Sequence, residues 1–146
     1  MSIENGTDLS PKQKELRTGI ITYLKNEGFR PELDDDGDIL FKYQGEKFYI
    51  VVDRQLENPM MVNLISSYTL PQEYSSLIVK VAANEINMYK GVKMVVTTES
   101  FQLRAEYFVQ EPMAFVTAIE KTVMIISAAE RDLLACFEKA KEQVLK

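Results

Sequence analysis

The stretch ILFKYQGEKFYIVV, residues 39–52, decides the fold of this chain. Its first five residues predict one β-strand. In the strand that follows, Phe48, Ile50 and Val52 alternate with the residues between them, in the period-two pattern of a half-buried strand. The turn at residues 44–46 is too short for a crossover connection, so the two strands are expected to pair antiparallel. An antiparallel sheet is therefore the expected centre of the molecule.

Similar patterns predict the remaining elements on either side of this hairpin. Further strands are expected at residues 60–69, 92–98 and 101–110, helices at 10–28, 71–90 and 112–145, and a polar loop at 53–59. The order α-β-β-β-α-β-β-α indicates an α+β fold of two layers, with helices packed on an antiparallel five-stranded sheet. We expect a disordered tail at residues 1–9 and a single α+β domain at residues 10–146.

Local signals set the expected ends of the helices. Ser10 can cap the first helix, and Gln13 can complete a capping box with it. Gly28 is expected to end that helix, because glycine adopts the left-handed conformation at little cost. Pro71 suits the first turn of the second helix, and Gly91 is expected to follow its end.

The second helix has a predicted buried face and two asparagines near its end. Asn84 and Asn87 lie one turn apart, and we expect them to cap carbonyl groups of the last turn. The buried face is predicted to consist of Tyr74, Leu77, Ile78, Val81 and Ala82.

The last predicted helix carries an apolar seam with the spacing of a heptad repeat. The seam consists of Val116, Ile119, Val123, Ile126, Glu130, Leu133, Phe137, Ala140 and Val144. Such a stripe usually covers the protein's own sheet. A continuous helix over residues 112–145 would be on the order of 50 Å long. It is therefore expected either to break near residues 127–130 or to extend past the domain.

The segment from residue 113 to residue 129 holds more apolar surface than one stripe can use. Only Glu120 and Lys121 are charged there, and residues 123–126 place four large apolar side chains around a full helical turn. A helix that is apolar all round is normally buried on more than one side. We therefore expect a protein partner, most simply a second copy of the chain, to contact this segment. The predicted interface residues are Met113, Val116, Ile119, Val123, Met124, Ile125 and Ile126.

Composition narrows the classes of function. The net charge of −5 repels phosphate backbones, so nucleic acid is not an expected partner. Histidine is absent, which removes the commonest general base and the imidazole metal ligands. Cys136 is the single cysteine and is expected to pack as a small hydrophobe. The longest aliphatic run, residues 123–126, is too short to span a membrane. We expect a cytoplasmic protein with no catalytic residues, no cofactor and no metal.

The acidic run at residues 34–38 supports an alternative. Asp34, Asp36 and Asp38 take alternate positions around Gly37, as ligands do in an EF-hand calcium loop. Tyr43 stands where that loop needs a bidentate glutamate, and a strand follows instead of a helix. The pattern favours a polar turn that starts a strand. A weak cation site in the turn is the alternative interpretation.

Several short motifs are similar to those of the bacterial sensory-transduction-regulator (YbjN-type) family, which has the type III secretion chaperone-like fold. The similar stretches are residues 36–41, residues 48–53, the helical segment 83–87 and the strand segment 93–96, and with the element order they cover residues 10–146. The resemblance implies a two-layer fold, often dimeric, that acts by binding proteins. It implies no catalytic residues.

The expected function is a non-enzymatic protein-interaction module of a chaperone-like or regulatory kind. The expected form is a homodimer that binds a protein partner or a client segment, with a sheet edge or a groove as the client site. The alternative is a small-ligand or metal-binding domain, or a carboxylate-based enzyme, that uses the acidic turn from Asp34 to Asp38.

Overall fold

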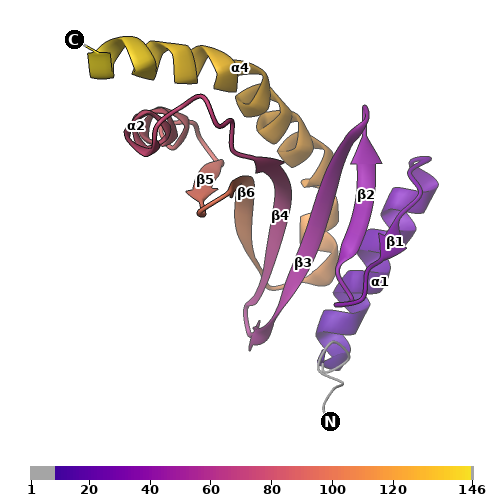
Figure 1. The fold of residues 1–146 in the computed structure, drawn as a ribbon. Coiled ribbons are helices and arrows are strands. Elements are labelled where there is room, and N and C mark those ends of the chain that lie inside the picture. Colours follow the sequence, from indigo (N-terminus) through magenta and orange to yellow (C-terminus); the bar gives the residue numbers. More distant parts are fainter. Residues whose placement is uncertain (1–8, 146) are drawn as a thin grey trace.

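The computed structural model describes residues 9–145, which form a mixed α+β domain (Figure 1). Residues 1–8 of the tail predicted at 1–9 lie outside the described residues. Leu9, which was also assigned to the tail, is buried in the core. The elements are α1 (Pro11–Asn26), β1 (Glu32–Leu33), β2 (Ile39–Tyr43), β3 (Glu46–Glu57), β4 (Met60–Thr69), α2 (Ser76–Ile86), β5 (Lys93–Val96), β6 (Ser100–Val109), α3 (Pro112–Val116) and α4 (Ile119–Leu145).

The sheet is antiparallel throughout and has the strand order β1-β2-β3-β4-β6-β5. Over the described part of the chain it therefore has six strands, one more than predicted. The additional strand β1 has only two residues, which pair with Leu40 and Ile39 of β2. Two residues are too few to show a period-two pattern, so nothing in the local sequence marks them as a strand.

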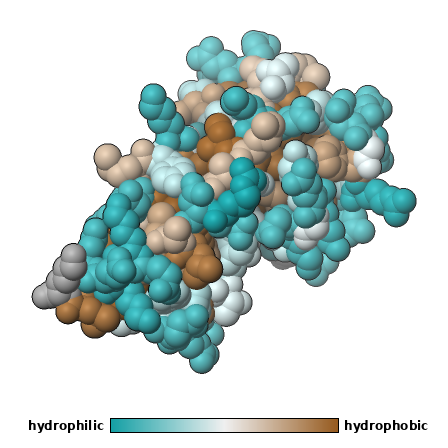
Figure 2. Space-filling model, turned by 90° about the horizontal axis from the view of Figure 1, so that it is seen from above, coloured by the Kyte–Doolittle hydropathy of each residue, from teal (hydrophilic) through white to brown (hydrophobic). Residues whose placement is uncertain are grey.

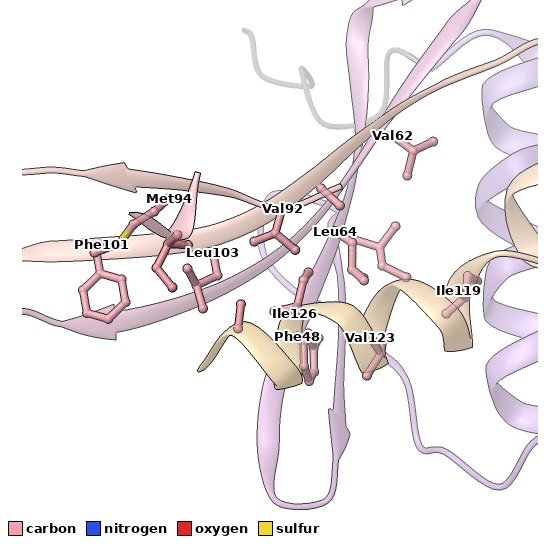
Figure 3. Close-up of a cluster of buried hydrophobic side chains, with 14 of the residues drawn as sticks. Phe48, Val62, Leu64, Val92, Met94, Phe101, Leu103, Ile119, Val123 and Ile126 are labelled. Atoms are coloured by element: carbon pink, nitrogen blue, oxygen red, sulfur yellow. The ribbon is translucent and has the colours of Figure 1, made fainter. Parts of the chain in front are cut away.

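The helices lie on one face of the sheet (Figure 1). The predicted alternation in the second strand is confirmed, because Phe48, Ile50 and Val52 of β3 are all buried. Figure 3 shows Ile119 and Val123 of α4 in this core, together with side chains from the strands. The core therefore lies between the sheet and the helices, with residues of α1, α2 and α3 in it as well as those of α4.

The start of α1 follows the predicted capping box. The Ser10 hydroxyl accepts from the backbone N–H of Gln13, and the Gln13 side chain accepts from the backbone N–H of Ser10. Gln13 also reaches β3, because its Nε2 donates to the carbonyls of Asp53 (2.9 Å) and Leu56 (3.1 Å). One buried glutamine thus caps the helix and joins it to the sheet. At the other end, Gly28 has φ +92°, as its expected role requires.

The predicted loop at residues 53–59 and both predicted ends of the second helix are wrong, and longer-range pairing or a cap explains the first two differences. The polar loop predicted at residues 53–59 is mostly strand, since β3 continues to Glu57 and pairs again with β4 after a register shift. Helix α2 begins at Ser76 instead of Pro71, because the Ser75 hydroxyl caps it by accepting from Ile78 N–H. It ends at Ile86, earlier than expected.

The buried face of α2 is also shifted by about one position from the prediction. Leu77 is exposed and Val81 is half-buried, whereas Ile78 and Ala82 are buried as predicted. The residues that α2 buries are Ile78, Val79, Ala82, Ala83 and Ile86. They face α4 and β5, the elements against which α2 packs.

The last predicted helix is two helices, with the break at Thr117 and Ala118. The Thr117 hydroxyl donates to the Ala114 carbonyl, and Ala118 N–H donates to Phe115 in a tighter turn. Residues 127–130, where one of the two alternatives placed a break, are continuous α-helix. The apolar seam lies on the protein's own core, because all its members are buried except the half-buried Glu130 and Val144. Of the described helices, none combines the length and apolar character needed to cross a membrane.

Candidate protein-interaction site

A cleft of about 1140 Å³ lies between α2 and the end of the sheet at β5. Helix α2 forms one wall, and β5 with the turn to β6 forms the other. The connection from β4 to α2 closes one end. The lining residues are Thr69, Leu70, Pro71, Gln72, Tyr74, Ser76, Val79, Lys80, Ala83, Asn84, Met94, Val96, Thr97, Thr98, Glu99 and Ser100. This volume exceeds the usual range of a small-molecule pocket, about 300–1,000 Å³.

The cleft runs beside an unpaired sheet edge. Strand β5 is the last strand of the sheet and, among residues 9–145, pairs only with β6. The backbone N–H of Thr97 donates to Ser100 at 2.8 Å and so points toward β6. Backbone groups alternate in direction along a strand, so those of Val96 point to the unpaired side. Those of Met94 do the same, and its N–H donates to the Asn87 side chain at 2.6 Å.

The lining of the cleft combines apolar and polar side chains. Val79, Ala83 and Met94 are buried, and Val96 is 41% exposed at the mouth. Lys80 is the only basic residue of the lining, and it forms no salt bridge with the part of the chain that the structure describes. The cleft can therefore take an apolar group and a negative charge close together.

Tyr74 anchors the loop that closes one end of the cleft. Its ring stacks on Phe137 of α4 with centroids 4.8 Å apart, and its hydroxyl donates to Glu138. This hydrogen bond, with burial and the Glu138 charge, raises the pKa of Tyr74 to about 12. The hydrogen bond and the stacking together tie the loop to α4.

The structure divides the residues predicted to form the partner interface. Val116, Ile119, Val123 and Ile126 are buried in the chain's own core, so they are not available to a partner. Met113 of α3 is 58% exposed and Met124 of α4 is 51% exposed, while Ile125 is half-buried against the core. The predicted interface therefore narrows to Met113, Met124 and Ile125, which we call the methionine surface.

Helix α1 lies next to the methionine surface at Met113. The sulfur of Met113 lies 3.2 Å from the position that a Cβ on Gly19 would take. Tyr23 is one turn further along α1, and its pKa is raised by burial, then by Glu27 and by Glu120 of α4. Met124 follows Glu120 by one turn. Met113 therefore lies beside α1 at Gly19, and the Glu120 charge, one turn before Met124, acts on Tyr23 of the same helix.

Other exposed hydrophobic side chains are scattered. Figure 2 shows hydrophobic residues among hydrophilic ones over the upper face of the molecule. The large exposed hydrophobic residues outside the methionine surface are Leu33, Leu56, Leu77, Met88, Val96, Phe108, Leu134 and Leu145. These residues come from seven different segments of the fold. The methionine surface differs from them because its three residues all come from the predicted apolar segment at residues 113–129.

The acidic turn brings its three predicted carboxylates together. One oxygen from each of Asp34, Asp36 and Asp38 lies within 4.8 Å of the others. Asp34 Oδ1 also accepts the backbone N–H groups of residues 36 and 38, both at 2.9 Å. Partial burial, and then the Asp34 charge, raise the pKa of Asp38 to about 6, although Arg54 opposes the shift. These hydrogen bonds build the predicted polar turn, and the carboxylate spacing keeps the cation-site alternative open.

The remaining polar residues of interest have structural contacts. Glu106 pairs with Lys93 at 3.1 Å and Arg104 at 3.6 Å on the sheet face away from the helices. Cys136 is buried, and burial raises the pKa of its thiol, so it packs as the small hydrophobe that we predicted. Asn87 accepts from Met94 of β5 instead of capping its helix, which corrects the prediction for that residue.

The sequence did not indicate the α2–β5 cleft. Its walls come from segments up to about thirty positions apart, and it depends on β5 being the end strand. A hairpin of β5 with β6 was predictable, but the pairing of β6 with β4 was not. Strand order decides which strand has an unpaired side, and local patterns do not determine strand order.

Comparison with known proteins shows the fold. The chain is similar to the structure described as an uncharacterized protein from Methanothermobacter thermautotrophicus, with a TM-score of 0.54 and 12% identity. The match covers 85% of this chain and 97% of that one. No family model matches the sequence, and no curated protein does. At this identity the structural likeness supports the α+β architecture alone.

Proposed function

We propose that this chain is a non-enzymatic protein-interaction module, chaperone-like or regulatory, that forms a homodimer and binds a segment of a partner protein. The observation that carries the proposal is the methionine surface, where Met113 and Met124 are more than half exposed on helices whose other side forms the core. Methionine is common at adaptable binding surfaces because its side chain is flexible and polarizable.

A second copy of the chain is the partner that this surface suits. Glu120 and Lys121 are adjacent, exposed and oppositely charged, one turn before Met124 and Ile125. In a two-fold dimer the same patch meets itself. Glu120 of one copy can then approach Lys121 of the other while the methionines bury each other. Such an arrangement combines an apolar centre with a charged rim, as protein interfaces usually do.

Light scattering over a wide range of concentrations tests the dimer. The wild-type chain is expected to show a dimer that dissociates on dilution. Met124→Asp should raise the dissociation constant by about tenfold or more, because it buries an unpaired charge. Met88→Asp is the matched control, since Met88 is 81% exposed at the end of α2, away from this surface. A wild-type monomer at high concentration, or equal dimerisation of both variants, would contradict the proposal.

The resemblance to the YbjN-type family points in the same direction. We propose membership of that family from the motifs at residues 36–41 and 48–53 and from the element order. The implied role is protein binding without catalysis. A cytoplasmic location is part of the same proposal.

A second candidate function is cation binding at the acidic turn. The observation that favours it is the approach of the carboxylates of Asp34, Asp36 and Asp38 to within 4.8 Å of one another. If this turn binds calcium, millimolar Ca²⁺ should raise the melting temperature of the wild type and not that of Asp36→Asn. An equal shift in both proteins would assign the effect to ionic strength.

A further inference from the structure

The geometry points to the α2–β5 cleft as the site that takes the partner's segment, as an extended peptide that adds a strand to β5. This inference rests on the proposed function and identifies the client site within it. The peptide that the cleft suits carries an apolar residue and a carboxylate two positions apart. Backbone pairing, side-chain direction and charge each support one part of the inference.

The unpaired edge provides the backbone pairing. The N–H and C=O of Val96 point into the cleft, as does the C=O of Met94, while the N–H of Met94 is occupied by Asn87. An extended backbone offers a donor and an acceptor at alternate positions and can satisfy these groups. A compact small molecule has no such periodic pair. The edge is therefore matched to a peptide main chain.

The dimensions of the cleft fit a short peptide. Its α2 wall extends from Ser76 to Asn84, which is about 12 Å of helix at 1.5 Å per residue. An extended chain rises about 3.3 Å per residue, so this length accommodates roughly four residues. Strand β5 itself has four residues, from Lys93 to Val96. Both walls of the cleft are therefore long enough for about four residues of an extended peptide.

Side-chain direction specifies the apolar position. Residues directly opposite each other in neighbouring strands point to the same face of a sheet. Val96 points to the helix side, because it pairs with the buried Phe101. A peptide residue opposite Val96 would therefore point toward Val79 and Ala83 of α2. An apolar residue there would cover Val96, which is 41% exposed in the single chain.

Charge specifies the second position. In an extended peptide, the next residue on the same face is two positions away. Lys80 lines the same wall immediately after Val79 and has no salt bridge within residues 9–145. A carboxylate two positions from the apolar residue can approach its ammonium group. Glu99, at the turn beyond β5, disfavours a second carboxylate at that end of the cleft.

The experiment uses the full chain and two hexapeptides. Each peptide is acetylated and amidated, and each consists of threonine with valine at its third position. The first has glutamate at its fifth position and the second has lysine there. Binding is followed by amide chemical-shift changes of the ¹⁵N-labelled protein. We expect the glutamate peptide to shift the amide of Val96 and the amides of the neighbouring cleft residues, with weaker binding of the lysine peptide.

Two variants separate backbone pairing from charge. Val96→Pro removes the N–H that points to the unpaired side and leaves the β5–β6 hydrogen bonds in place. It should weaken binding about tenfold. Lys80→Glu changes an exposed position on α2, so it should fold normally. It should weaken binding of the glutamate peptide about fivefold and reverse the preference between the two peptides.

The outcomes distinguish this inference from the proposed dimer. Unchanged affinity of a folded Val96→Pro, no reversal in Lys80→Glu, or shifts that map outside the cleft would each overturn the cleft assignment. The dimer is judged separately by the mass of the wild type and of Met124→Asp. Peptide binding to a monomeric chain would support the cleft while the dimer fails. A dimer without peptide binding would do the opposite.

Discussion

Gln13→Ala is expected to lower the free energy of unfolding by about 3 kcal/mol. Gln13 is fully buried, and its side chain makes three hydrogen bonds to backbone groups. Its Oε1 accepts from Ser10 N–H at 2.8 Å, and its Nε2 donates to the carbonyls of Asp53 and Leu56. Alanine leaves these three groups without that partner, and each loss costs on the order of 1 kcal/mol.

Urea denaturation followed by circular dichroism measures this change. With a slope of about 2 kcal/mol per M, the midpoint should fall by roughly 1.5 M urea. Ser10→Ala removes only the cap and should cost about 1 kcal/mol. Lys14→Ala, at the next, exposed position, should stay within about 0.5 kcal/mol of the wild type. If Gln13→Ala cost no more than Ser10→Ala, the bonds from α1 to β3 would contribute nothing and the reasoning would be refuted.

Gln13→Glu tests the same bonds with almost no change in shape. The carboxylate keeps an acceptor for Ser10 N–H, but it places an oxygen opposite the carbonyls of Asp53 and Leu56 where the amide donated. At neutral pH the variant should be at least as unstable as Gln13→Ala. It should recover part of the loss at low pH, because the protonated carboxyl can donate one of these bonds. A stability equal to that of the wild type at neutral pH would exclude the assigned donors.

Three further changes have expected outcomes that thermal or urea denaturation can check. Asp38→Asn should stabilise the fold at pH 7 by on the order of 1 kcal/mol after allowance for solvent screening. The folded-state pKa of Asp38 is raised to about 6, mainly by burial, so its contribution to stability is lost as pH rises through 6. The stability gained by Asp38→Asn should therefore disappear near pH 4. A variant less stable than the wild type at pH 7 would contradict this reasoning. Ile126→Ala should lower the free energy of unfolding by about 2–5 kcal/mol because Ile126 is fully buried. Met124→Ala should lower it by less than about 0.5 kcal/mol in the monomer, because Met124 is exposed. Gly19→Ala should stabilise α1 by about 0.5–1 kcal/mol, since the Met113 sulfur that its Cβ meets lies near the end of a flexible, exposed side chain. A destabilised Gly19→Ala would mean that Met113 of α3 cannot move aside.

The parts of the fold that were predictable are those that local chemistry decides. The capping box of Ser10 and Gln13 involves residues three apart, and the left-handed conformation of Gly28 ends the same helix. The tight turn of β2 and β3 contains two residues with positive φ, Gln44 and Gly45. Each of these signals involves only a few neighbouring residues. The local structure that these signals predict is therefore the structure that the folded chain has.

The parts that were missed depend on residues far apart in the chain. Gln13 reaches the carbonyls of residues 53 and 56, and no local pattern indicates that contact. The extension of β3 to Glu57 depends on its pairing with Met60 of β4, which overrides the polar composition of that stretch. The apolar excess in residues 113–129 predicted a partner interface, but four of the seven predicted residues lie in the chain's own core. Which side chains remain exposed depended on how α4 rotates onto the sheet.

The two edges of the sheet differ in a way that bears on how the chain avoids uncontrolled pairing. Strand β1 has two residues, which pair only with Ile39 and Leu40, so the rest of β2 up to Tyr43 shares that edge of the sheet. Strand β5 has four, but Asn87 occupies the N–H of Met94 and shortens the unpaired stretch to the region of Val96. Helix α2 stands beside this stretch as the other wall of the cleft and so restricts the approach of a second sheet. A single extended segment can enter, because it needs only the width of one strand, about 4.8 Å. The same features that limit edge-to-edge association therefore select for a peptide at β5.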